Sequence, residues 1–124
     1  MFKPLLSKTA LLRACAVFGS LAIAGGAQAH AHLMASTPAA NASGPSPAQI
    51  ALKFSEAPLA KFSGIMLLTA SGGAVEVKPL KSADRNALMF APATLLKPGV
   101  YSVKWHAVTA DTHRTQGAFT FTVR

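Results

Sequence analysis

Cysteine and acidic residues are both scarce in this sequence, and each scarcity excludes certain kinds of chemistry. Cys15 is the one cysteine in 124 residues, and it lies in a segment that we expect to be removed. The remaining domain then lacks the thiolate that blue-copper centres, thiolate zinc sites, iron–sulfur clusters and thiol nucleophiles require. Asp and Glu together number four, which leaves little room for a hydrolase that works through a pair of carboxylates. Serine-hydrolase, phosphate-loop and zinc-protease motifs are also absent from the sequence.

The N-terminal segment has the pattern of a secretory signal peptide. Its basic residues come first and are Lys3, Lys8 and Arg13. An uncharged apolar stretch from 14 to 27 follows, and Ala27-Gln28-Ala29 fits a small-x-small cleavage site. The apolar stretch is shorter than the roughly 20 residues that a membrane-spanning helix needs, so cleavage is favoured over an uncleaved anchor. We therefore expect residues 1–29 to be a signal peptide and residues 30–124 to be the exported domain.

Basic residues outnumber acidic ones by 12 to 4, which makes nucleic acid or an acidic surface a partner to consider. Three of the basic residues belong to the expected signal peptide, and the others are spread thinly along the chain. The aromatic residues fall at alternating positions typical of a core and not in the pattern of a stacking platform. We therefore expect no binding of nucleic acid.

The exported domain has the pattern of short β-strands, because no window of twelve or more residues shows helical periodicity. The segment from Ala35 to Pro47 is rich in Ala, Ser, Gly and Pro and is predicted to be irregular. Apolar residues then alternate with polar ones at a period of two, with Gly64 expected to mark a bend or bulge. The predicted strands lie near residues 50–54, 62–69, 75–77, 87–91, 100–108 and 117–123, between turns at Gly72-Gly73 and Lys97-Pro98-Gly99. This spacing predicts an all-β Greek-key sandwich or barrel of about seven strands.

The four histidines are the residues that could carry chemistry: His30, His32, His106 and His113. Cleavage after Ala29 would make His30 the first residue, so that its α-amine and its imidazole could chelate one metal in a ring. The α-amine has an ordinary pKa of about 7.7 to 8.0, and a metal can displace its proton at neutral pH.

Asp111 and His113 form the second candidate group, since one residue separates the acid from the imidazole. On an extended segment, residues two apart point to the same side. Together with the two nitrogens of His30 they would offer three nitrogens and one oxygen. Cu(II) prefers nitrogen and oxygen ligands in tetragonal geometry, so this set predicts a Cu(II) site.

Less specific interpretations remain open beside the metal site. A terminal His30 can be an accident of cleavage, and the Asp111–His113 pair can be solvated or part of a turn. His106 follows Trp105 on an apolar strand, which is more typical of a structural or surface histidine. Glu56 is an isolated acid after the first predicted strand, typical of a surface charge. His32 offers another copper geometry, a square plane of the amine, two backbone amides and its imidazole, but we expect the fold to favour His113.

Several segments together resemble the CopC family of periplasmic copper-resistance proteins, across essentially the whole exported domain. The segments that carry the resemblance are His30-Ala31-His32-Leu33, Ser36-Thr37-Pro38-Ala39, Leu52-Lys53-Phe54-Ser55-Glu56, Pro98-Gly99-Val100-Tyr101-Ser102-Val103-Lys104-Trp105, Asp111-Thr112-His113 and Gly117-Ala118-Phe119-Thr120-Phe121.

The resemblance implies an immunoglobulin-like β-barrel in the periplasm that binds one Cu(II) per chain through His30, Asp111 and His113. Glu56 and His32 are second-rank candidates. It further implies a monomer that is not an enzyme and that buffers copper or delivers it to an inner-membrane copper transporter. The alternatives are a histidine-brace copper enzyme that oxidises polysaccharides, which a carboxylate from Asp111 at the metal argues against, and a metal-free immunoglobulin-like binding module.

Two features depart from the family pattern. Members that also bind Cu(I) carry a methionine-rich loop, since soft thioethers select Cu(I). The methionines of the exported domain are scattered at Met34, Met66 and Met89, with none between residues 71 and 86, which argues against a separate Cu(I) site. Arg114 also stands where many members have proline.

Overall fold

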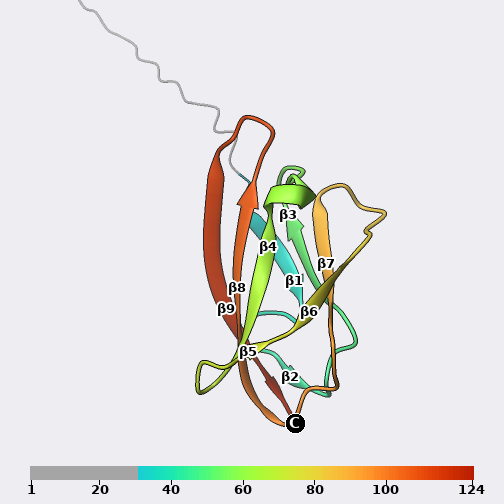
Figure 1. Cartoon of the computed structure of the whole chain (residues 1–124), viewed down its shortest axis with the longest axis vertical. Coiled ribbons are helices and arrows are strands. Elements are labelled where there is room, and N and C mark those ends of the chain that lie inside the picture. The colour runs from blue at the N-terminus through green and yellow to red at the C-terminus, as the bar shows by residue number, and fades with distance from the viewer. Residues whose placement is uncertain (1–30) are drawn as a thin grey trace, which may run out of the picture.

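Two β-sheets packed face to face form the protein, in a computed structural model that describes residues 31–124 (Figure 1). One sheet has the order β1 (Leu33–Thr37), β3 (Ile50–Phe54), β7 (Ala87–Pro92) and β6 (Val77–Leu80). The other has the order β2 (Ser43–Gly44), β9 (Arg114–Val123), β8 (Gly99–Val108), β4 (Gly64–Thr69) and β5 (Ala74–Val75). The one helical turn among these residues is a 3₁₀ helix, η1 (Ala60–Phe62). The all-β sandwich is confirmed, with nine strands where about seven were predicted.

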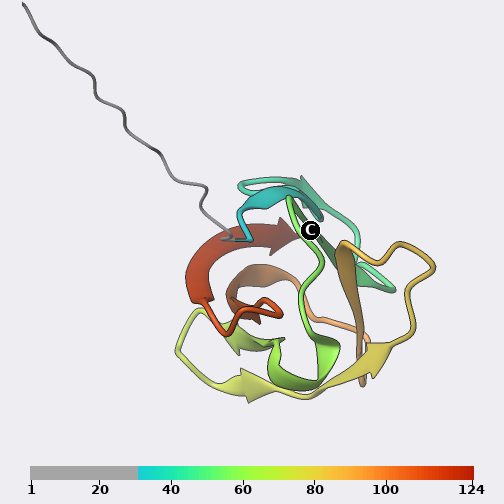
Figure 2. The same cartoon turned by 90° about the horizontal axis from the view of Figure 1, so that it is seen from above.

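The chain crosses between the sheets at the β1–β2, β2–β3, β3–β4, β5–β6 and β7–β8 connections, so that each sheet contains strands from distant parts of the sequence. Seen from above, the sheets curl around a common interior (Figure 2). Neighbouring strands are antiparallel, except that β2 runs parallel to β9. The predicted signal peptide and His30 lie outside the described residues.

The core is built by the period-two alternation that the sequence shows. On β8, Tyr101, Val103, Trp105 and Ala107 are buried while the residues between them face outward. The ring of Phe54 on β3 meets that of Trp105 edge-on, with the centroids 5.3 Å apart. Burial of such large aromatic side chains supplies much of the apolar area that stabilises a domain of this size.

Gly117 on β9 makes room for the indole of Trp105, its partner across the β8–β9 pair. A Cβ atom at Gly117 would lie 2.7 Å from Cζ2 and 2.9 Å from Cε2 of the indole ring. These separations are far below the 3.5–4.0 Å contact distance of two carbon atoms. The glycine is therefore required by the close approach of the ring and not by an unusual backbone angle.

Four local predictions were wrong. The segment Ala35–Pro47 is not irregular throughout, because most of β1 and all of β2 fall within it; β1 is mostly exposed and takes its order from backbone pairing with β3. Residues 75–77 do not form one strand, since β5 and β6 belong to different sheets. Gly64 makes no bulge and pairs regularly with His106, while Phe62 belongs to η1 and not to the following strand.

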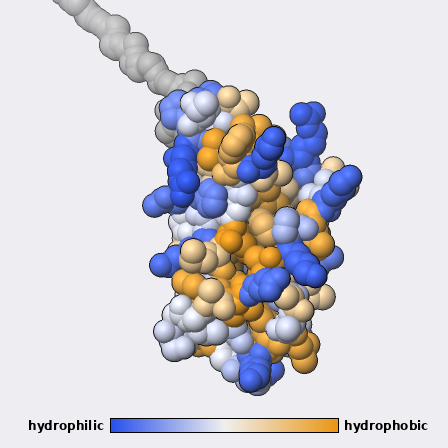
Figure 3. Space-filling view, viewed as in Figure 1, coloured by the Kyte–Doolittle hydropathy of each residue, from blue (hydrophilic) through white to orange (hydrophobic). Residues whose placement is uncertain are grey.

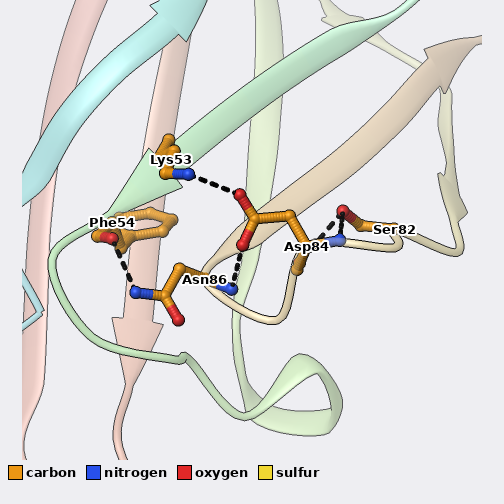
Figure 4. A network of polar contacts seen from close by, with 5 residues as sticks. All are labelled: Lys53, Phe54, Ser82, Asp84 and Asn86. Carbon is orange, nitrogen blue, oxygen red and sulfur yellow. Dashed lines mark hydrogen bonds and ion pairs between the residues drawn. The ribbon is translucent and has the colours of Figure 1, made fainter.

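A polar network holds the β6–β7 loop against the end of β3 (Figure 4). Lys53 Nζ donates to Asp84 Oδ2 at 2.6 Å, and the backbone N–H of Asn86 donates to Asp84 Oδ1 at 2.9 Å. The Asn86 side chain in turn donates to the carbonyl of Phe54 at 3.3 Å. The hydrogen bond from Lys53 lowers the pKa of Asp84, with a smaller effect from the Asn86 backbone. The end of β3 is thereby fixed, immediately before Ser55.

Candidate metal centre

The turn between β8 and β9 lies at one end of the sandwich and carries both Asp111 and His113 (Figure 1). Thr109 begins the turn: its carbonyl accepts the N–H of Thr112 at 2.8 Å, and its own N–H donates to the carbonyl of His113 at 3.0 Å. Thr112 has a φ of +70°, in the left-handed region that a β-branched residue rarely adopts. Such strained residues gather at functional sites, and here the strain lies between the two candidate ligands.

The structure brings the side chains of Asp111 and His113 together. His113 Nδ1 lies 2.9 Å from Asp111 Oδ2, and the His113 backbone N–H donates to Asp111 Oδ1 at 3.3 Å. The two side chains are 57% and 40% exposed for His113 and Asp111 respectively, so an ion in solution can reach them. The sequence argument placed them on one side of an extended segment. The left-handed turn at Thr112 achieves the same convergence instead.

Hydrogen bonds keep Asp111 ionised. The hydroxyl of Thr109 donates to Asp111 Oδ1, and this bond, followed by the one from His113, lowers the pKa of Asp111 to about 2. A carboxyl group with so low a pKa is an anion at every pH above about 4. The turn therefore presents a carboxylate, the protonation state that a cation needs.

The chain segment that follows His30 is fastened beside this turn. Ala31 is buried, and its carbonyl accepts a hydrogen bond of 2.7 Å from the hydroxyl of Thr115 on β9. The backbone of His32 exchanges two hydrogen bonds of 2.9 Å with Ser55, just past β3. The start of the described chain is thus held between β9 and the end of β3.

Glu56 lies at the same end of the sandwich. It follows Ser55, which bonds to His32, and precedes Leu59, whose N–H donates to the carbonyl of Val108 at 2.8 Å. The loop therefore runs from the N-terminal segment to the last residue of β8. Glu56 is half-buried in this loop.

Within residues 31–124, no three His, Cys, Asp or Glu side chains are close enough to hold one metal ion. Asp111 and His113 form a pair, while Glu56, His32 and His106 do not complete a set of three with them. The predicted ligand set thus has two members in the described structure, and its third, His30, lies outside it.

His106 is placed on the outer face of β8, where its ring covers Gly64 of β4. A Cβ atom at Gly64 would lie 3.5 Å from His106 Cε1. Burial, followed by the charge of Arg114, lowers the pKa of His106 below its ordinary value, which favours the neutral imidazole. The interpretation of His106 as a structural or surface histidine agrees with this position.

The spacing of the Asp111–His113 pair fits two neighbouring ligands of one metal ion. Nitrogen and oxygen ligands bind first-row metals at about 2.0–2.2 Å, so two ligands at right angles lie about 3 Å apart. The observed separation of Nδ1 and Oδ2 is 2.9 Å. An imidazole nitrogen and a carboxylate oxygen also belong to the nitrogen–oxygen class that Cu(II) prefers.

Two threonines help to shape this end of the sandwich and were not singled out from the sequence. Thr109 orients Asp111, and Thr115 fastens Ala31. The position of Thr109, two residues before an acid in a turn, is a local signal that could have identified it. Thr115 contacts a residue 84 positions away, so no local pattern could have predicted its role.

None of the helical structure within residues 31–124 has the length and apolar character of a membrane-crossing helix. The described chain is instead organised entirely around its two sheets.

Known proteins are similar to this chain in both sequence and fold. Copper resistance protein C of Pseudomonas syringae pv. tomato is 40% identical over 105 residues, which cover 79% of this chain and 83% of that protein. Protein YobA of Escherichia coli K12 is 40% identical over 99 residues, covering 77% and 80% of the respective chains.

Solved structures agree with these sequence matches. The crystal structure of PcoC, a methionine-rich copper resistance protein from Escherichia coli, is similar with a TM-score of 0.73 and 38% identity, covering 77% of this chain and all of that one. CopC from Methylosinus trichosporium OB3b has a TM-score of 0.70 and 28% identity, covering 76% and 93%. The model of the CopC domain matches residues 33–124. With that match spanning the whole sandwich, the chain belongs to the CopC family.

Proposed function

We propose that residues 30–124 bind one Cu(II) ion through the α-amine and imidazole of His30, the carboxylate of Asp111 and the imidazole of His113. The names of the relatives, which are copper resistance proteins, support copper as the metal. The chemistry of the donor set supports the divalent ion.

One observation carries the proposal, namely the tether of Ala31 beside the turn that holds Asp111 and His113. Thr115, which binds the Ala31 carbonyl, is two residues from His113 along β9. The proposal requires His30, the residue before Ala31, to reach this turn, and consecutive Cα atoms are 3.8 Å apart. A histidine at that position can supply the two nitrogens that complete the pair.

The proposed role is buffering of copper in the periplasm, or its delivery to an inner-membrane transporter, by a monomeric protein that is not an enzyme. Met34, Met66 and Met89 lie on three different strands, β1, β4 and β7, which supports a site for Cu(II) and not a thioether site for Cu(I). With Asp111 as a ligand, little coordination space is left for oxygen. Copper-dependent oxidation of chitin or cellulose well above a free-copper control would contradict this role.

Extension of the N-terminus tests the use of the α-amine. A chain that begins at His30 is compared with the same chain preceded by two extra residues, by competition against a chelator of known Cu(II) affinity. The extension converts the amine to an amide and destroys the chelate ring, so we expect the dissociation constant to rise by at least about a hundredfold. Equal affinities would remove the amine from the site.

Replacement of the two histidines separates the folded site from a local one. With Cu(II) at about 100 times its dissociation constant, binding to the native state stabilises it by about 2.7 kcal/mol. For a domain of this size that is a rise in melting temperature of about 10–20 °C. We expect His113→Ala to abolish most of this rise in melting temperature and His32→Ala to retain most of it. The hydrogen bonds between residue 32 and Ser55 use the backbone of residue 32, so they survive the loss of the His32 imidazole. The opposite result would place copper on the N-terminal segment alone.

A further inference from the structure

A groove of about 540 Å³ lies on the outer face of the five-stranded sheet, where β4, β8 and β9 run side by side. Its walls include outward-facing side chains of β4, β8 and β9, all exposed except the half-buried His106: Met66, Lys104, His106, Arg114, Gln116 and Ala118. Figure 3, viewed as Figure 1 is, shows hydrophobic residues gathered along the middle of the face that carries β4, with strongly hydrophilic residues beside them. Neither Asp111 nor His113 lines this groove.

The register of the sheet explains why these side chains share one face. Met66 pairs with Lys104, which pairs in turn with Ala118 on β9. His106 pairs with Gln116 in the next row on the same face. Directly opposed residues on one face of a sheet have Cβ atoms about 4.5–5.5 Å apart, so these rows form a continuous surface.

The groove is cationic. Lys104 and Arg114 are both exposed, and neither takes part in an ion pair within residues 31–124, where the ion pairs join Lys53 to Asp84 and His113 to Asp111. None of the acidic residues of the sequence lines the groove. Burial lowers the pKa of His106, and the positive charge of the nearby Arg114 lowers it further.

Apolar side chains lie beside Lys104, because Met66 and Ala118 flank it across the sheet, and the row of His106 and Gln116 separates it from Arg114. Ile65, Trp105 and Ala118 line the same groove, and Met66 is 55% exposed. An occupant that fits must therefore offer a few separate negative charges together with an apolar side chain. A membrane surface or a nucleic acid is broad and densely charged, and its many phosphates do not match two separate cations with apolar side chains beside one of them.

We propose that this groove is a docking site for an acidic segment of a partner protein. Two carboxylates of the segment bind Lys104 and Arg114, and an apolar side chain next to the first carboxylate contacts Met66, which pairs with Lys104. Opposite charges at a docking surface steer encounter and fix register. Because Arg114 directly follows His113, a docked segment lies next to the candidate metal centre. The proposal itself needs no copper and goes beyond the proposed function.

A short acidic peptide serves as the probe, and the copper-free chain starting at His30 serves as the protein. The peptide is acetyl-Asp-Glu-Leu-Glu-Asp-amide, and its control is acetyl-Asn-Gln-Leu-Gln-Asn-amide. In a titration followed by ¹⁵N NMR at low salt, we expect saturable shifts of the backbone amides of Met66, Lys104 and Gln116 with the acidic peptide. We expect none with the neutral one, and weaker binding at higher ionic strength.

Charge reversal on two matched surfaces decides the assignment. Lys104→Glu combined with Arg114→Glu is expected to weaken binding at least about tenfold. Lys78→Glu combined with Lys97→Glu changes the net charge equally but lies outside the groove, so its effect should be under about threefold. Circular dichroism and thermal melts check the fold of each variant, and Lys104→Gln with Arg114→Gln replaces the first pair if that pair fails to fold.

Several outcomes overturn the proposal. Absence of saturable shifts at millimolar peptide, shifts centred elsewhere, or equal weakening by both pairs of substitutions would each refute a docking groove. Vesicles of phosphatidylglycerol are tested in parallel. Binding to vesicles that depends on Lys104 and Arg114, without binding of the peptide, would assign the groove to a membrane instead.

Discussion

Substitution of Gly117 by alanine tests how tightly the core is packed beneath the candidate metal centre. The new Cβ atom would lie 2.7 Å from Cζ2 of Trp105 and 2.9 Å from Cε2. The ring cannot retreat easily, because Phe54 packs against it edge-on and is itself only 1% exposed. Either the indole leaves its rotamer or β9 moves away from β8.

The expected cost follows from overpacking. Forcing extra atoms into a well-packed core costs about 1–3 kcal/mol, and the two close contacts with a rigid ring place Gly117→Ala at about 2–3 kcal/mol. Since 1 kcal/mol corresponds to about 4–8 °C for a domain of this size, the melting temperature should fall by about 10–20 °C. The loss is large against the roughly 5–15 kcal/mol by which such domains are stable.

The assay is urea unfolding followed by circular dichroism and fluorescence, since Trp105 is the one tryptophan in the sequence. Gly44→Ala on β2 is the matched control: a Cβ atom there meets nothing within 4 Å, so its effect should stay within about 0.5 kcal/mol. Trp105→Phe removes the clashing atoms. The double variant should therefore be about 1–2 kcal/mol more stable than the sum of the single losses predicts.

Two results would refute this account of the core. One is Gly117→Ala with native stability. The other is strict additivity of Gly117→Ala and Trp105→Phe, which would show that the two residues do not interact.

Three further predictions concern single side chains. In Thr109→Val, loss of the hydroxyl should raise the pKa of Asp111 above about 2, as measured by NMR titration of the carboxyl carbon. Because folding lowers this pKa, the ionised Asp111 stabilises the native chain at neutral pH, and this stability is lost as the pH falls through the pKa of the folded state. In the variant the loss should therefore occur at a higher pH than in the native chain. Thr115→Val leaves the buried carbonyl of Ala31 without its hydroxyl donor and should cost about 1–3 kcal/mol in urea unfolding, with weaker Cu(II) binding. Leu95→Lys should leave stability within about 0.5 kcal/mol, because Leu95 is 84% exposed; a larger loss would contradict its position.

The sequence predicted the strands that alternate and missed those that do not. Strands β3, β7, β8 and β9 bury one face, and their apolar residues recur at every second position, so the pattern located them to within a few residues. Strand β1 is mostly exposed and β2 has two residues, so neither leaves a pattern to read. Their order comes from hydrogen bonds to β3 and β9, which are distant in sequence.

The candidate site likewise has features that the sequence could predict and features that it could not. The convergence of Asp111 and His113 was predictable because the two residues are neighbours in sequence. The backbone conformation that brings them together was not predictable, since the left-handed backbone of Thr112 depends on the hydrogen bond between Thr109 and His113 that closes the turn. The tether between Ala31 and Thr115 links the two ends of the domain, and only the folded sheet brings them together. The ligand role of His30 remains a prediction.

Strand β9 runs from the candidate metal centre to the opposite end of the sandwich. The strand begins with Arg114 beside the candidate metal centre and ends at Val123, and ten residues at about 3.3 Å each span roughly 30 Å. The final residue, Arg124, is held there by a backbone bond to Gly44 at the opposite end of the sandwich (Figure 1). A linker attached to Arg124 could therefore anchor the protein to an electrode or a resin with the candidate metal centre directed into the solution, which is the orientation that a test of metal binding at a surface requires.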